Sequence, residues 1–103
     1  MSEAASQGAA DAGIGGLRRT LEIANKRGLH ARAAAKFVRT AGQFDSVVRV
    51  GFKGQEVSGL SIMGLMMLSA GIGSEIEITC SGRQAVDAMT ALSALVEGKF
   101  GED

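Results

Sequence analysis

The sequence has a single cysteine, no excess of charge of either sign and no long apolar run. Cys80 has no partner for an internal disulfide, and no set of residues has the spacing of metal ligands. Eleven basic and eleven acidic side chains leave a formal net charge of zero, which argues against bulk binding to nucleic acid or to an acidic membrane surface. The first residues also lack a signal-peptide pattern. We therefore expect a cytoplasmic protein with no metal, cofactor, membrane segment or nucleic-acid partner.

The length predicts one domain. A chain of 103 residues with 46% hydrophobic content is enough for one compact core. Residues 1–16 are dominated by Ala, Gly and Ser and show no apolar periodicity. The sequence therefore predicts a flexible N-terminal tail over residues 1–16 and a single domain over residues 17–103.

Apolar periodicity predicts seven elements in this domain. Alternating apolar and polar residues mark half-buried strands, and apolar residues three and four positions apart mark one face of a helix. In chain order we predict a strand near 20–23, a helix over about 31–40, two hairpin strands at 47–52 and 55–58, a short helix from 62, a strand over 75–80 and a final helix from 85. The order is βαββαβα.

The alternation within the strands also predicts the fold class. Strands of a parallel sheet covered on both faces read as continuous apolar runs, whereas these strands have one apolar face each. Elements with one apolar face bury it by packing in two layers. We expect an α+β fold, an open-faced β-sandwich in which three helices cover one face of a four-stranded, mostly antiparallel sheet.

His30 is the only histidine and lies at the start of the helix predicted over residues 31–40. The free backbone N–H groups there and the positive end of the helix dipole favour an anion such as a phosphoryl group. The same field disfavours an imidazolium and leaves a ring nitrogen lone pair free to attack phosphorus. The guanidinium of Arg32 suits phosphate oxygens. From position alone, His30 is also open to interpretation as a capping or surface residue.

Two segments resemble the signatures of one family. Residues 28–33, Gly-Leu-His-Ala-Arg-Ala, resemble the active-site segment of HPr, the histidine phosphocarrier of the bacterial phosphotransferase system. Residues 61–66, Ser-Ile-Met-Gly-Leu-Met, resemble the second signature of that family at a matching spacing. The resemblance implies that enzyme I phosphorylates His30 using phosphoenolpyruvate, that Arg32 assists and that an enzyme IIA receives the phosphate. It also implies a monomeric phosphoryl relay rather than an enzyme.

Ala33 departs from the pattern of most sugar-pathway members, which have proline after the arginine. Alanine is a good helix former, so the helix is expected to survive the change. Alanine at this position resembles the nitrogen-related branch of the family, which regulates rather than drives sugar uptake. We therefore predict an NPr-like protein, with a sugar-uptake HPr as the alternative. The sixteen-residue leader is a second departure from compact members.

A basic stripe is predicted on the first helix, where Arg32, Lys36 and Arg39 recur at helical spacing. Such a stripe complements acidic partner surfaces. The alternative interpretation is a solvated helix face without a partner. Because of this complementarity, Lys36 and Arg39 of the stripe are candidate partner-binding residues.

Ser61 precedes the short helix and is predicted to cap its free amides. By resemblance it is also the regulatory serine, a target for an HPr kinase/phosphorylase. The inward face of this helix is predicted to consist of Ile62, Leu65 and Leu68. Three methionines are predicted to point outward and form an adaptable docking patch: Met63, Met66 and Met67.

Two other functions stay open at this point. One is a regulatory interaction domain of the same fold that is not phosphorylated. The other is a small-molecule-binding module that uses the open face of the sheet. Phosphorylation of His30 distinguishes both from a phosphocarrier.

Overall fold

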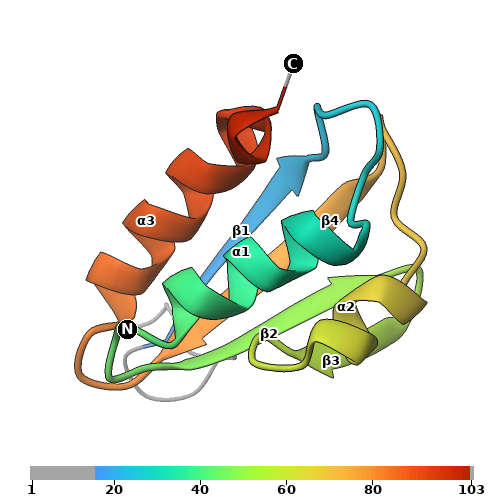
Figure 1. Ribbon diagram of the computed structural model, residues 1–103. Coiled ribbons are helices and arrows are strands. Elements are labelled where there is room, and N and C mark those ends of the chain that lie inside the picture. The colour runs from blue at the N-terminus through green and yellow to red at the C-terminus, as the bar shows by residue number, and fades with distance from the viewer. Residues whose placement is uncertain (1–15, 103) are drawn as a thin grey trace.

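The computed structural model describes residues 16–102, and residues 1–15 and 103 lie outside the described part. The tail predicted over residues 1–16 therefore falls outside it, apart from Gly16. The elements are β1 (Leu17–Glu22), α1 (Ala31–Ala41), β2 (Val47–Phe52), β3 (Gln55–Ser58), α2 (Ile62–Met67), β4 (Glu75–Ser81) and α3 (Ala85–Glu97), followed by a 3₁₀ turn, η2 (Lys99–Gly101). The predicted βαββαβα order is confirmed (Figure 1).

The strands form one sheet in the order β1-β4-β2-β3, and each pair of neighbours in the described residues is antiparallel. The last strand, β4, lies between β1 and β2, so backbone hydrogen bonds join the two ends of the domain. In these central pairs Ile76 lies opposite Leu21, and Ile78 lies opposite Val50. The predicted mostly antiparallel sheet is confirmed.

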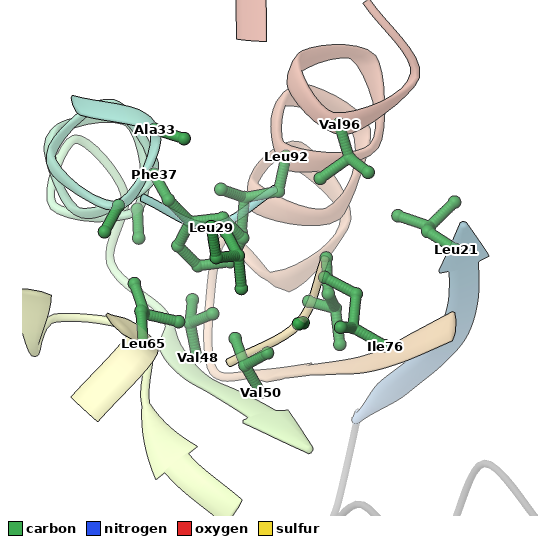
Figure 2. Close-up of a cluster of buried hydrophobic side chains, with 14 of the residues drawn as sticks. Leu21, Leu29, Ala33, Phe37, Val48, Val50, Leu65, Ile76, Leu92 and Val96 are labelled. Carbon is green, nitrogen blue, oxygen red and sulfur yellow. The ribbon is translucent and has the colours of Figure 1, made fainter. Parts of the chain in front are cut away.

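The core lies between the sheet and the three helices. Along β2, Val48 and Val50 are buried while Arg49 between them is exposed, as expected for a strand with one covered face. Figure 2 shows the side chains of Phe37 and Leu92 from the helices converging on those of the strands. Full burial of side chains of this size contributes about 1.5–3 kcal/mol each. The open-faced two-layer architecture is confirmed.

The loop before α1 rests directly on the loop after α2. Gly28 has a left-handed backbone, with φ at 64°, and a Cβ added there would lie 2.4 Å from the carbonyl oxygen of Ala70. The next residue, Leu29, is buried, and its amide donates to the same oxygen at 3.0 Å. Glycine is therefore required at position 28 for both conformation and clearance. This contact determines where His30 lies relative to α2.

Helix α2 departs from the prediction at one residue. Leu65 and Leu68 are buried, but Ile62 is 41% exposed, so its predicted inward orientation is wrong. At 3.6 residues per turn, steps of three drift by about 60°, so Ile62 and Leu68 lie about 120° apart around the axis. The core covers only the part of this arc that Leu65 and Leu68 occupy, and Ile62, at the first position of the helix, lies outside it.

Replacement of Gly28 tests the contact between the two loops. We expect Gly28→Ala to lower the free energy of unfolding by about 3 kcal/mol or more, because a left-handed alanine costs roughly 1–2 kcal/mol and the Cβ also meets backbone. Gly54→Ala is the matched control, since Gly54 also has positive φ, at 81°, but its Cβ would meet nothing within 4 Å. Urea unfolding of both variants measures the difference. Equal losses of stability would contradict the close approach at Ala70.

Candidate functional site

His30 occupies the N-cap position of α1. Its backbone is extended, with φ at −71° and ψ at 176°, and its carbonyl oxygen accepts the amide of Ala34 at 2.8 Å. Its side chain makes no capping hydrogen bond and is only 14% exposed, so it is neither a capping side chain nor an ordinary surface residue. The amides of the first helical turn have no partner within the helix, and the dipole is positive there. The imidazole is therefore held beside an environment that favours an anion.

The ring of His30 contacts a carboxylate that the sequence analysis missed. Nε2 of His30 lies 2.5 Å from Oε2 of Glu102, although the two residues are 72 positions apart. The other carboxylate oxygen, Oε1, accepts the side-chain amide of Asn25 at 3.0 Å. The hydrogen bond with His30 lowers the pKa of the Glu102 carboxyl below its ordinary value, and the bond from Asn25 adds to this against an opposing effect of burial. Glu102 is thus an ionised acceptor at neutral pH.

This contact distinguishes the two ring nitrogens. A neutral imidazole has one N–H donor and one lone-pair acceptor, and the partner of one nitrogen determines which nitrogen holds the proton. Since a carboxylate faces Nε2, the proton belongs on Nε2 of His30 and the lone pair on Nδ1. An imidazole held in this way can act as a nucleophile through Nδ1, with the carboxylate orienting the ring.

The C-terminal segment reaches His30 because it is anchored on α1. Phe100 is fully buried, and its carbonyl oxygen accepts a hydrogen bond from Nζ of Lys36 at 2.6 Å. Lys36 is consequently half-buried and engaged, whereas Arg32 and Arg39 are exposed. The predicted basic stripe is thus divided: its middle residue holds the C-terminal segment, and its two outer residues face solvent.

Arg32 lies on the first turn of α1, two positions after His30, and is exposed. Within residues 16–102, no hydrogen bond or salt bridge joins Arg32 to the ring of His30. Its role in phosphoryl transfer stays a prediction. An exposed guanidinium at this place is available to a phosphoryl group that arrives on the ring.

Ser61 is the N-cap of α2. Its Oγ accepts the backbone amide of Gly64 at 2.9 Å, which confirms the predicted capping role. A Cβ added at Gly64 would lie 2.9 Å from the same oxygen and 3.0 Å from Cβ of Val57, so glycine at 64 lets the cap and β3 approach closely. Regulatory phosphorylation of Ser61 stays a prediction.

The methionines of α2 point outward. Met63 is 69% exposed, Met67 is 72% exposed and Met66 is 38% exposed, as the sequence analysis predicted. Two further apolar side chains are exposed on the segments flanking α2, and the sequence analysis did not single them out: Leu60 and Ile72. The exposed surface of α2 is therefore apolar, and its role in docking stays a prediction.

Other candidate sites have less to support them. Cys80 is buried, and burial raises the pKa of its thiol to about 11, so it is a poor nucleophile. No group of three or more His, Cys, Asp or Glu residues that could hold a metal occurs within residues 16–102. Over the same residues, no helix combines the length and apolar character needed to cross a bilayer. A hollow of about 430 Å³ on the open sheet face is lined mainly by polar and charged residues, unlike the apolar pockets that bind most small ligands.

Sequence comparisons identify relatives of known type. The family model described as the PTS HPr component phosphorylation site matches residues 17–98. The phosphocarrier protein HPr of Neisseria meningitidis serogroup A is 51% identical over 86 residues, which cover 84% of this chain and 97% of that protein. HPr of Cupriavidus necator is 49% identical, and the match again covers 84% of this chain and 97% of that protein. The phosphocarrier protein NPr of Shewanella violacea is 41% identical, with 84% and 94% covered.

Solved structures match the fold. HPr from Thermoanaerobacter tengcongensis superposes with a TM-score of 0.81 at 42% identity, covering 84% of this chain and 98% of that one. HPr from Bacillus anthracis superposes with a TM-score of 0.76 at 40% identity, covering 79% and 96%. With the site geometry and the family match over residues 17–98, these relatives show that the chain belongs to the HPr family of phosphocarrier proteins of the phosphotransferase system.

Proposed function

We propose that the chain accepts a phosphoryl group on Nδ1 of His30 from phosphorylated enzyme I and passes it to an enzyme IIA, acting as a monomer in the cytoplasm. The observation that supports this most directly is the orientation of His30. Its ring lies at the N-terminus of α1 with Nε2 against Glu102, which leaves Nδ1 as the nitrogen with the lone pair.

The surroundings of His30 suit a phosphoryl group that must leave again. The helix N-terminus contributes about 0.3–1 kcal/mol to an exposed anion and up to about 2 kcal/mol to a partly buried one. Arg32 adds a guanidinium that matches phosphate oxygens in geometry. These contributions hold the group on the ring without making its onward transfer slow. The chain is a relay in this proposal, and catalysis of each transfer belongs mainly to the partners.

We propose that both partners dock on the surface formed by α1 and α2. The exposed methionines supply apolar area that adapts to more than one partner, and Arg32 and Arg39 supply charge that complements acidic surfaces. Lys36 contributes less to such a surface than the sequence suggests, because it is bound to the Phe100 carbonyl. Phosphorylation of Ser61 by an HPr kinase/phosphorylase would place about two negative charges at the edge of this surface.

The branch of the family is a finer proposal. Ala33 is fully buried in the first turn of α1. Alanine instead of proline at this position resembles the nitrogen-related branch and supports that assignment. The higher identity to HPr of Neisseria meningitidis, 51% against 41% for NPr of Shewanella violacea, supports the sugar-uptake alternative. We propose the nitrogen-related role and keep the sugar role as the second candidate.

Replacement of His30 tests the relay itself. Incubation of the chain with phosphoenolpyruvate and an enzyme I is expected to give one acid-labile phosphate per molecule, and His30→Ala is expected to give none. Because His30 is the only histidine, a phosphohistidine formed on the chain can lie only at this residue. Mass spectrometry of the intact chain measures the addition, and thermal unfolding checks that the variant is folded. Absence of phosphate on the unmodified chain, with a donor active on another HPr, would refute the relay.

Acceptor preference tests the branch. A nitrogen-related chain is expected to transfer its phosphate to a nitrogen-related enzyme IIA at least tenfold faster than to a sugar-specific one. Single-turnover transfer from the phosphorylated chain to each acceptor measures the ratio. The opposite preference would assign the chain to sugar uptake.

Charge at Ser61 tests the docking surface. Ser61→Glu is expected to weaken binding to enzyme I by about tenfold at low salt, because a carboxylate placed beside the methionines repels an acidic partner. Ser61→Ala is the matched control: it removes the cap bond to Gly64 at about 1 kcal/mol of stability but adds no charge. Isothermal titration calorimetry measures both affinities. Equal affinities for the two variants would contradict docking at this surface.

A further inference from the structure

A chain of hydrogen bonds links the loop before α1, the C-terminal segment and His30. We propose that Glu102 is a positioning residue for phosphoryl transfer: it holds the His30 ring in the tautomer with hydrogen on Nε2, fixes the ring plane and offsets the positive charge that the ring gains when Nδ1 is phosphorylated. The inference rests on the proposed relay function of His30. It adds a residue that lies outside both sequence segments by which the family resemblance was found.

Both oxygens of the Glu102 carboxylate are committed. Oε2 faces Nε2 of His30 at 2.5 Å, and Oε1 accepts Nδ2 of Asn25 at 3.0 Å. Asn25 is itself fully buried and also donates from Nδ2 to the Gly28 carbonyl at 2.9 Å. The two acceptors determine which way the Asn25 amide faces, and its Oδ1 is then left without a partner among the described residues. The two hydrogen bonds from Nδ2 hold the buried amide in this orientation although its oxygen loses a partner. The amide is therefore a rigid support for the carboxylate.

The segment that carries Glu102 is structured. Lys99, Phe100 and Gly101 have φ of 59°, 54° and 74°, a run of left-handed residues that costs free energy at the two that are not glycine. The full burial of Phe100 and the bond from Lys36 to its carbonyl oppose that cost. The amide of Glu102 then donates to the Lys99 carbonyl at 2.9 Å. The turn therefore places the carboxylate of Glu102 beside His30 at the N-terminus of α1.

The chemistry requires no proton to move. The Nδ1 lone pair of neutral His30 attacks phosphorus, an N–P bond forms, and the bond between phosphorus and the donor breaks with its electron pair leaving on the donor. The ring keeps its Nε2 proton and becomes positive, facing the Glu102 carboxylate. On onward transfer the N–P bond breaks, its electron pair returns to Nδ1, and the ring is neutral again. Glu102 remains an ionised acceptor throughout, as an acid that orients a catalytic histidine does.

The carboxylate also has an effect that opposes phosphoryl transfer to the ring. A negative charge near the ring repels an incoming phosphoryl group, and removing it would then speed the reaction. We expect orientation and charge balance at the ring to prevail, because Glu102 faces Nε2 and not the attacking nitrogen. The sign of the rate change decides between the two effects.

The test compares Glu102→Gln with Glu97→Gln. Glu97 is the matched control because its side chain is 59% exposed and pairs with Arg19, away from His30. Two quantities are measured for each protein: the single-turnover rate of phosphoryl transfer from enzyme I, and the ring tautomer of His30 by ¹H–¹⁵N correlation at about pH 8.5, above the ordinary imidazole range. We expect Glu102→Gln to lower the rate about tenfold or more and to weaken the Nε2–H preference, because the negative partner that orients the ring is lost. Glu97→Gln is expected to change neither.

The outcomes separate this inference from the proposed function. Failure of the unmodified chain to accept phosphate would refute the relay and, with it, this inference, whereas the tautomer measurement still reports whether Glu102 orients the ring. An unchanged or faster rate in Glu102→Gln overturns the positioning role while leaving the relay intact. A tautomer that is unchanged even in Glu102→Ala, which has no acceptor at this position, overturns the orienting role as well. Glu102→Ala, which removes the acceptor altogether, is expected to reproduce the loss if Glu102→Gln is poorly folded.

Discussion

The rest of the site depends on the close approach between the backbone at Gly28 and the carbonyl oxygen of Ala70. That oxygen accepts the amide of Leu29 at 3.0 Å, and only a residue without Cβ leaves room for it. The contact determines where α1 begins, and therefore where the amides of its first turn and the ring of His30 lie. It also fixes that end of α1 against the segment that leaves α2. The proposed phosphorylation site and the proposed docking helix are consequently held together by this backbone contact.

Sheet topology explains how the end of the chain comes to the same place. Because β4 lies between β1 and β2, α3 packs over β1 as well as β4, and Arg19 of β1 bonds Glu97 near the end of α3. The segment after α3 therefore emerges beside the loop that follows β1. Asn25 from that loop and Glu102 from the C-terminal segment meet over the N-terminus of α1. The antiparallel order of the strands thus brings together groups far apart in sequence.

Apolar periodicity in the sequence predicts where helices and strands lie and which face of each is buried. It does not predict contacts between residues far apart in the sequence. The order of elements, the single covered face of the sheet and the outward methionines of α2 follow from alternation and helical spacing. The cap at Ser61 follows from a serine that directly precedes a helix. Glu102 could not be found in this way, because its role depends on a turn with three left-handed residues that no pattern announces. Lys36 has the same helical spacing as the exposed Arg32 and Arg39, yet its Nζ donates a hydrogen bond to the carbonyl oxygen of Phe100, 64 positions away. Helical spacing groups Ile62 with Leu65 and Leu68, but spacing does not show how much of that arc the core covers, and the core covers only the part that Leu65 and Leu68 occupy.

A phosphocarrier needs a site that binds the phosphoryl group neither too weakly nor too strongly. The helix N-terminus and Arg32 favour the anion, whereas a nearby carboxylate opposes it. The carboxylate of Glu102, however, contacts Nε2, the ring nitrogen that keeps its proton in the proposed relay, so it would stabilise the positive ring of a phosphorylated His30 while weakening the field felt by the phosphate. In the proposed relay these opposed contributions partly offset each other, so the site neither releases the phosphoryl group at once nor traps it, and the partner that docks decides the direction of transfer.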